Sequence, residues 1–143
     1  MAKTLAITGA TGFVGSTLRR LAVAQGFDVR ALTRRPQPDT PGLTWVAGAL
    51  DNPESLSALV AGADAVLHVA GVVNAPDRAG FVRGNVAGTQ AMVNAAKAAG
   101  IPRFIHVSSL AARAPDLSIY GWSKAEAETR VAESGLDLSL IHI

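Results

Sequence analysis

The chain of 143 residues fits one domain spanning residues 1–143, and its length argues against a multidomain enzyme. Hydrophobic residues make up 49% of the sequence and charged residues 17%, which predicts a packed core and excludes a disordered chain. The formal net charge of +2 is too small for a nucleic-acid-binding surface. The first 50 residues nevertheless contain six basic and two acidic side chains, so a small anion is expected to bind in this part of the chain.

The sequence contains no cysteine, which excludes a disulfide framework, a thiolate nucleophile and a cysteine-based zinc site. Its three histidines lack the spacing of metal ligands, so no metal is expected. The N-terminus leads directly into a strand-like segment without a signal-peptide pattern, and no apolar run approaches the ~18 residues of a membrane helix. These features predict a cytoplasmic protein without a membrane span.

Short apolar segments rich in β-branched residues alternate with longer Ala-rich amphipathic segments, which is typical of βαβ units. The predicted strands are Lys3–Thr8, Asp28–Thr33, Leu43–Val46, Ala65–Val69, Arg103–Ser108 and Leu136–Ile141. The predicted helices are Val14–Gln25, Pro53–Ala61, Asn85–Ala99 and Ser118–Glu133, followed by the helix-ending glycines Gly26, Gly62, Gly100 and Gly135. Several strands are apolar almost throughout, which indicates a parallel sheet covered by helices on both faces.

A glycine-rich turn, Thr8-Gly-Ala-Thr-Gly-Phe-Val-Gly15, lies directly between the first predicted strand and the first predicted helix. In such a turn Gly9 permits a tight bend, Gly12 lets the backbone approach a pyrophosphate, and Gly15 allows close packing of the helix on the sheet. The helix N-terminus, with Thr11, Phe13 and Val14 around it, would face the anion. The turn therefore predicts nucleotide binding, and the alternative is a purely structural turn.

The end of the second predicted strand bears on the choice of cofactor. A dinucleotide-binding domain that prefers NAD usually presents an acidic residue here to the ribose hydroxyls, whereas this chain has Thr33. Arg34 and Arg35 follow, and a guanidinium can pair with a 2′-phosphate through charge-assisted hydrogen bonds. NADP is therefore expected in preference to NAD. The alternative is that both arginines are solvated surface charges.

The candidate catalytic residues are Ser108 and Ser109 at the end of the fifth predicted strand, and Tyr120 and Lys124 at the start of the last helix. Residues four apart share a helical face, and an ammonium one turn from a phenol stabilises the phenolate. Tyr120 can then exchange a proton near neutral pH. A serine at the strand end can hydrogen-bond a substrate carbonyl as negative charge develops on it. The alternative is that Tyr120 is an ordinary amphipathic side chain at a helix start.

These motifs, together with Asn-Val-Ala-Gly-Thr at positions 85–89, resemble those of the short-chain dehydrogenases/reductases. The similarity covers the whole chain and is strongest to the extended and atypical branches, which include the NAD-dependent epimerase/dehydratase family. It implies a Rossmann-like fold: a three-layer α/β structure with about six strands in a doubly wound parallel sheet of order 3-2-1-4-5-6. The cofactor cleft would lie at the carboxyl edge of this sheet.

The resemblance assigns roles to the candidate catalytic residues. Tyr120 is the acid/base, Lys124 is its electrostatic partner and a ribose ligand, and Ser109 orients the carbonyl. The family register selects Ser109 over Ser108, which is left to contact the backbone or the cofactor. Asn85 has two interpretations that can hold together: it helps to position Lys124 through backbone and water contacts, or it caps the helix that it opens.

The resemblance also extends the cofactor site to Leu50, Asp51 and the segment Val69-Ala70-Gly71. Leu50 would pack on the adenine, and the small residues after the fourth strand would line the cofactor. Ala49 departs from the family pattern, which has an aspartate there, so a hydrogen-bond acceptor for the adenine is missing. The segment around Asp51 also has an ordinary interpretation as a helix start with Asn52 as its cap. His68 and His106 are expected to be packed, hydrogen-bonded histidines rather than proton carriers.

The predicted function is that of an NAD(P)-dependent oxidoreductase that transfers hydride to or from a carbinol or carbonyl of a small molecule such as a nucleotide sugar. The family's C-terminal substrate-binding region is not found after Ile141, so a truncated chain is expected and turnover is left open. One alternative is a non-catalytic dinucleotide-binding module of the sensor or respiratory-complex accessory type, and another is an inactive fragment. Related proteins dimerise through the Ala-rich helices, which makes a homodimer a further expectation.

Overall fold

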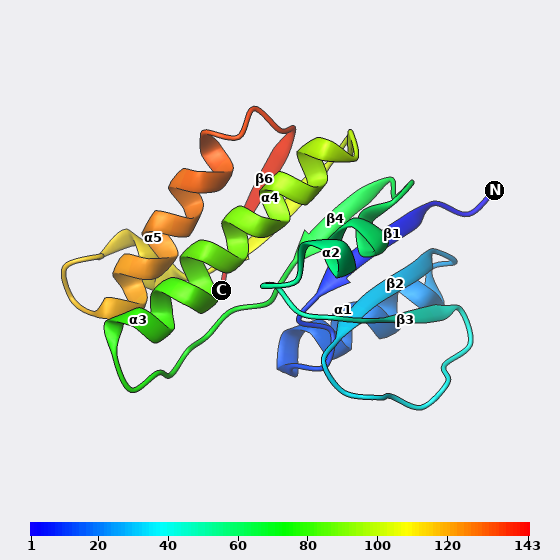
Figure 1. Ribbon diagram of the computed structural model, residues 1–143, viewed down its shortest axis with the longest axis horizontal. Helices are drawn as coiled ribbons and strands as arrows, with labels where there is room; N and C mark the ends of the chain where they lie inside the picture. The colour runs from blue at the N-terminus through cyan, green and yellow to red at the C-terminus, as the bar shows by residue number, and fades with distance from the viewer.

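A computed structural model describes all residues, Met1–Ile143, and contains one six-stranded parallel sheet (Figure 1). The strand order is β3-β2-β1-β4-β5-β6, the doubly wound order expected from the sequence. The strands are β1 (Thr4–Thr8), β2 (Asp28–Thr33), β3 (Leu43–Ala47), β4 (Ala65–His68), β5 (Phe104–Ser108) and β6 (Leu138–His142). All five strand pairs are parallel, so the carboxyl ends of β1, β2, β4 and β5 meet at one edge of the sheet.

The helices are α1 (Phe13–Ala24), α2 (Pro53–Val60), α3 (Arg78–Phe81), α4 (Gly88–Ala98) and α5 (Ile119–Ala132). They form layers on both sides of the sheet (Figure 1). On one face, Ala22 of α1 packs with a small cluster that includes Ile7 and Val29. On the other face, α2, α4 and α5 cover a larger core around Met92 and Phe104. No helix is both long and apolar enough to cross a bilayer.

The four predicted helix-ending glycines all have positive φ values between +65° and +87°, a conformation that L side chains rarely adopt. A Cβ atom at any of these glycines would meet nothing within 4 Å, so backbone conformation, and not crowding, favours glycine there. The helix ends were therefore correctly predicted from local chemistry.

One predicted helix start is wrong. The helix expected to begin at Asn85 begins at Arg78, where the Asp77 side chain accepts a hydrogen bond from the Gly80 amide. A π-helical segment, Val82–Ala87, then joins α3 to α4 and contains Asn85. A short 3₁₀ segment, Leu110–Arg113, also follows β5 and was not expected. π-Helical turns are rare and occur frequently at functional sites.

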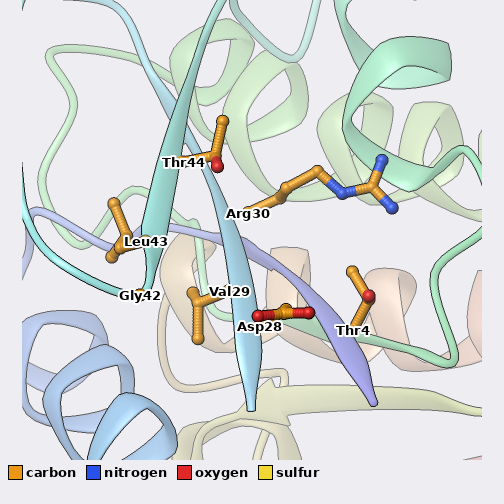
Figure 2. A pocket seen from close by; sticks show the side chains of 7 residues that line it. All are labelled: Thr4, Asp28, Val29, Arg30, Gly42, Leu43 and Thr44. Carbon is orange, nitrogen blue, oxygen red and sulfur yellow. The ribbon is translucent and has the colours of Figure 1, made fainter. Parts of the chain in front are cut away.

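A small pocket of about 350 Å³ lies at the amino-terminal edge of the sheet, between the starts of β1, β2 and β3. Figure 2 shows Arg30 and Thr44 on one side of these strands and Val29 and Leu43 on the other. The Arg30 guanidinium is engaged there, because it donates to carbonyl groups at the end of α2. This pocket lies at the opposite edge from the residues expected to bind a cofactor.

Candidate active site

A cleft of about 1190 Å³ lies at the carboxyl edge of the sheet, where the strand order reverses between β1 and β4. Ligands of doubly wound proteins bind at this position. Every site residue predicted from the sequence except Asn85 lines the cleft: Gly9, Thr11, Gly12, Phe13, Val14, Gly15, Thr33, Arg34, Leu50, Asp51, Val69, Ala70, Gly71, Ser108, Ser109, Tyr120 and Lys124. The fold therefore brings six separate stretches of sequence together around one cavity.

The three glycines of the first turn are required for different structural reasons. Gly9 has φ +71°, and a Cβ atom there would lie 2.6 Å from the Ala70 amide nitrogen. A Cβ atom at Gly15 would overlap the carbonyl group of Gly9. A Cβ atom at Gly12 would contact only the Gly9 carbonyl oxygen, at an ordinary 3.4 Å. Packing within the protein thus explains Gly9 and Gly15, whereas Gly12 leaves space that opens into the cleft.

The N-terminus of α1 completes a cradle for an anion. The helix has no side-chain cap and no acidic residue in its first turn. The backbone amides of Phe13, Val14 and Gly15 have no acceptor within the protein. Free amides and the positive end of the helix dipole attract a phosphate group. The residues of this turn therefore fit the pyrophosphate of a dinucleotide.

Arg34 and Arg35 lie in the turn that follows β2, and only Arg34 lines the cleft. The Thr33 hydroxyl donates to the Arg35 carbonyl at 2.6 Å and accepts from the Arg35 amide at 3.3 Å. This local turn leaves Arg34 lining the cleft, whereas Arg35 does not line it. Thr33 therefore shapes the backbone that presents Arg34.

At the far side of the cleft, Asn52 caps α2 by accepting from the Ser55 amide at 3.3 Å, with Pro53 in the first turn. This confirms the helix start predicted there, while Asp51 just before it lines the cleft. Leu50 also lines the cleft and lies close to α4, because a Cβ atom at Gly88 would be 2.8 Å from Leu50 Cδ1.

Asn85 does not cap a helix, so that interpretation was wrong. Its Oδ1 accepts from the Val72 amide at 2.6 Å, and its Nδ2 donates to the Val72 carbonyl at 2.8 Å. Nδ2 also donates to the Ser123 hydroxyl at 2.9 Å. Asn85 therefore ties the segment after Gly71 to α5 next to Lys124.

Tyr120 and Lys124 lie on the first two turns of α5, which begins where the Ser118 hydroxyl accepts from the Gly121 amide at 2.9 Å. The Tyr120 ring packs at 6.3 Å from the Phe81 ring. Lys124 is only 5% exposed, and its Nζ donates to the Val107 carbonyl at 3.5 Å. Burial lowers the pKa of Lys124 from its usual 10.5, and the nearby Glu128 carboxylate opposes this effect.

The two serines at the end of β5 differ in their contacts. The Ser109 Oγ accepts from the Ala111 amide at 3.1 Å and caps the 3₁₀ segment, which leaves its hydroxyl hydrogen able to donate. The Ser108 hydroxyl is buried and has no partner in the protein. Both residues line the cleft, but the Ser108 hydroxyl oxygen is buried beneath its surface.

His68 is buried and hydrogen-bonded, as expected. The Thr8 hydroxyl oxygen accepts from the Val69 and Ala70 amides, so its hydrogen is left to donate to His68 Nδ1 at 2.7 Å. His68 Nε2 then carries the proton and donates to the Thr89 hydroxyl at 3.1 Å. Burial holds the pKa of His68 well below its usual value, so the ring is neutral.

His106 is also buried, but the expectation that it is hydrogen-bonded was wrong. Neither ring nitrogen has a partner, and the ring stacks on His68 at 5.5 Å between centroids. Burial, with a smaller contribution from the Lys124 charge, lowers the pKa of His106 to about 3. Neither histidine is therefore a proton carrier at neutral pH.

The sequence reasoning missed the part of the cleft formed by the π-helical segment. Gly80, Arg83, Gly84 and Gly88 line the cleft there. A Cβ atom at Gly84 would overlap Val72, so the segment packs directly against the loop after β4. The usable signal was the placement of three glycines four residues apart, which puts small residues on one helical face.

Comparisons with known proteins bear on the family and the fold. A family model described as NAD(P)H-binding matches residues 9–143. The chain belongs to this NAD(P)H-binding family. Among solved structures, WbmH of Bordetella bronchiseptica in complex with NAD+ is 26% identical with a TM-score of 0.88, and the match covers 99% of this chain and 56% of that protein. A short-chain dehydrogenase/reductase superfamily protein of Agrobacterium tumefaciens with bound NAD is 28% identical with a TM-score of 0.86, over 97% of this chain and 48% of that protein.

Curated relatives of the NAD(P)H-binding chain include two named enzymes. Ceramide reductase of Caulobacter vibrioides is 46% identical over 132 residues, which are 89% of this chain and 41% of that enzyme. The 3-beta-hydroxysteroid dehydrogenase of Mycolicibacterium neoaurum is 34% identical over 113 residues, which are 72% of this chain and 31% of that enzyme. The chain thus spans less than half the length of these relatives. It is an NAD(P)H-binding domain similar to that of a short-chain dehydrogenase/reductase superfamily protein.

Proposed function

We propose that residues 1–143 form one cofactor domain that binds NADPH in preference to NADH and reduces a carbonyl to a carbinol, or catalyses the reverse reaction. One observation carries this proposal: the glycine cradle, Arg34 and the set Ser109, Tyr120 and Lys124 all line the same cleft. A nucleotide and a reacting carbonyl can therefore share one cavity.

The cofactor would be held along the carboxyl edge of the sheet. Gly12 and the free amides of α1 bind the pyrophosphate, and Arg34 binds the 2′-phosphate. Leu50 packs on the adenine beside Asp51, and Val69, Ala70 and Gly71 line the opposite end of the cofactor. When bound, the nicotinamide supplies or accepts the hydride.

The chain's own residues supply proton transfer and orientation. Tyr120 gives its proton to the substrate oxygen during reduction and takes it back in the reverse reaction. The Lys124 ammonium stabilises the phenolate that is left and binds ribose hydroxyls. The Ser109 hydroxyl donates to the carbonyl oxygen as negative charge develops. Asn85 supports this end of the cleft through its bonds to Val72 and Ser123.

A carbonyl on a lipid-like molecule is favoured over a nucleotide sugar as the substrate. The curated relatives are named for ceramide and for a hydroxysteroid, which are apolar molecules. Exposed apolar side chains are neighbours in sequence of the proposed reacting groups: Leu110, 55% exposed, follows Ser109, and Ile119, 42% exposed, precedes Tyr120. Such side chains can contact an alkyl chain or a sterol ring.

A non-catalytic dinucleotide-binding module is the second candidate. It is supported by the family model that residues 9–143 match, which is described by NAD(P)H binding alone. Both candidates require the same cofactor site, and they differ only in turnover.

Cofactor preference can be tested with Arg34→Ala and with Arg35→Ala as the matched control. Loss of a charge-assisted pair costs about 1.5–3 kcal/mol, so Arg34→Ala should weaken NADPH binding by roughly 10- to 100-fold and leave NADH binding unchanged. Arg35→Ala should leave both affinities unchanged, because Arg35 does not line the cleft. Equal effects of the two variants on NADPH affinity would contradict the assignment of Arg34.

A further inference from the structure

Three side chains of α5 with ionisable groups share one helical face. Tyr120, Lys124 and Glu128 follow one another at intervals of four residues, so they form a stripe along the helix. Tyr120 and Lys124 line the cleft, and Glu128 lies one turn further from it. The proposed function uses the first two side chains and leaves the third without a role.

Lys124 needs a counter-charge. Its side chain is almost fully buried, and its one hydrogen bond in the protein is the 3.5 Å contact with the Val107 carbonyl. Burying an ammonium without an opposite charge carries a large desolvation penalty, which favours loss of the proton. A neutral Lys124 would no longer stabilise a phenolate.

Glu128 supplies a negative charge in a fixed position. Its Oε1 lies 2.6 Å from His142 Nε2, and the two side chains are 21% and 25% exposed. The carboxylate can only accept, so the imidazole donates this hydrogen bond. His142 is on β6 opposite Ser108 of β5, which fixes the carboxylate between the helix and the edge of the sheet.

Four polar neighbours of Lys124 carry no negative charge. His106 on β5 and His68 on β4 are buried and neutral, and Asn85 and Ser123 are polar and uncharged. Glu128 lies one helical turn from Lys124 without a direct ion pair to it, and its negative charge opposes the effect of burial from there.

We propose that Glu128, oriented by His142, is a positioning residue that keeps the Lys124 ammonium charged beneath the cleft. Its role in catalysis rests on the proposed function, but its effect on the charge of Lys124 does not. The two ideas can therefore fail separately.

The direct test is the titration of Lys124 in the protein without cofactor. The chain has three lysines, Lys3, Lys97 and Lys124, so lysine side chains labelled with ¹³C give few NMR signals, which Lys124→Arg assigns. Glu128→Gln should lower the pKa of Lys124 by about one unit or more, a tenfold loss of proton affinity. Glu126→Gln, two residues away and off the stripe, should leave it unchanged.

A second readout separates lost charge from lost packing. A buried lysine with a lowered pKa destabilises the folded state below that pKa, and the penalty disappears as the pH rises toward 10.5. The stability deficit of Glu128→Gln should therefore shrink between pH 7 and pH 10. If Glu128→Gln does not fold, His142→Ala, which frees the carboxylate, should lower the pKa of Lys124 in the same direction, and His142→Gln, which keeps a donor, should restore it.

An unchanged Lys124 titration in both Glu128→Gln and His142→Ala would overturn the proposal. Measuring NADPH affinity on the same samples distinguishes the two failures. If the wild-type protein does not bind NADPH but Lys124 responds to Glu128→Gln, the proposed function fails and the electrostatic role of Glu128 stands.

Discussion

The buried histidine pair predicts a steep loss of stability in mild acid. His68 and His106 are fully buried and neutral, with pKa values lowered well below 6.5, to about 3 for His106. Below pH 6.5 the unfolded chain therefore takes up protons that the folded chain does not, so the free energy of unfolding decreases as the pH is lowered. For His106, whose pKa is about 3, this contribution is about 1.4 kcal/mol per pH unit, or about 2.7 kcal/mol at pH 4.5.

His68 adds a loss in the same direction, so the pair should remove a large part of a stability that is about 5–15 kcal/mol for many domains. His106→Leu tests the cause, because the substitution keeps a similar volume and removes a ring whose nitrogens have no partner. Between pH 7 and pH 4.5 this variant should lose about 2.7 kcal/mol less than the wild type.

The assay is urea unfolding followed by circular dichroism at several pH values between 7.5 and ~4.5, with the carboxylates common to both proteins. Comparing the wild type with His106→Leu removes the contribution of those carboxylates. Parallel losses of stability in the two proteins would refute the reasoning that His106 stays neutral in the folded state.

Two further predictions concern the cleft. Gly15→Ala should lower the melting temperature because its Cβ overlaps the Gly9 carbonyl. Gly12→Ala should leave the melting temperature nearly unchanged and weaken NADPH binding. Equal melting temperatures of the two variants would contradict the packing argument. The wild-type chain should reduce a long-chain ketone with NADPH, and Tyr120→Phe should abolish this reaction, measured by NADPH absorbance. The NADPH Kd of Tyr120→Phe, measured by calorimetry, should stay within about twofold of the wild-type value. Retained turnover in Tyr120→Phe would exclude the phenol as the acid.

Much of the fold was predictable because its signals are local. The alternation of apolar and amphipathic segments predicts the six strands, and glycines such as Gly26 and Gly100 mark helix ends through their own backbone conformation. The cleft residues were predictable for a related reason: in a parallel sheet, residues that follow strand ends meet at one edge whatever their separation in sequence.

The errors concern contacts between distant residues. Asn85 donates a hydrogen bond to Ser123, 38 residues away. An asparagine and its neighbours in sequence do not distinguish such a long-range contact from a helix cap. The missing partners of His106 depend on how β4, β5 and α5 pack around it, which local sequence does not encode. The π-helical segment likewise depends on the close approach of Gly84 to Val72.

The cleft is expected to bind a dinucleotide through the Gly12 cradle, and calorimetric titration with NADPH measures this binding. Gly12→Asp is the matched variant: aspartate is a favourable residue at this helix N-cap position, so the protein should remain folded, but its carboxylate should repel the pyrophosphate. We expect saturable NADPH binding by the wild type and a loss of at least about tenfold in affinity in the variant. Absence of binding to the folded wild-type protein, or equal binding by Gly12→Asp, would contradict this expectation.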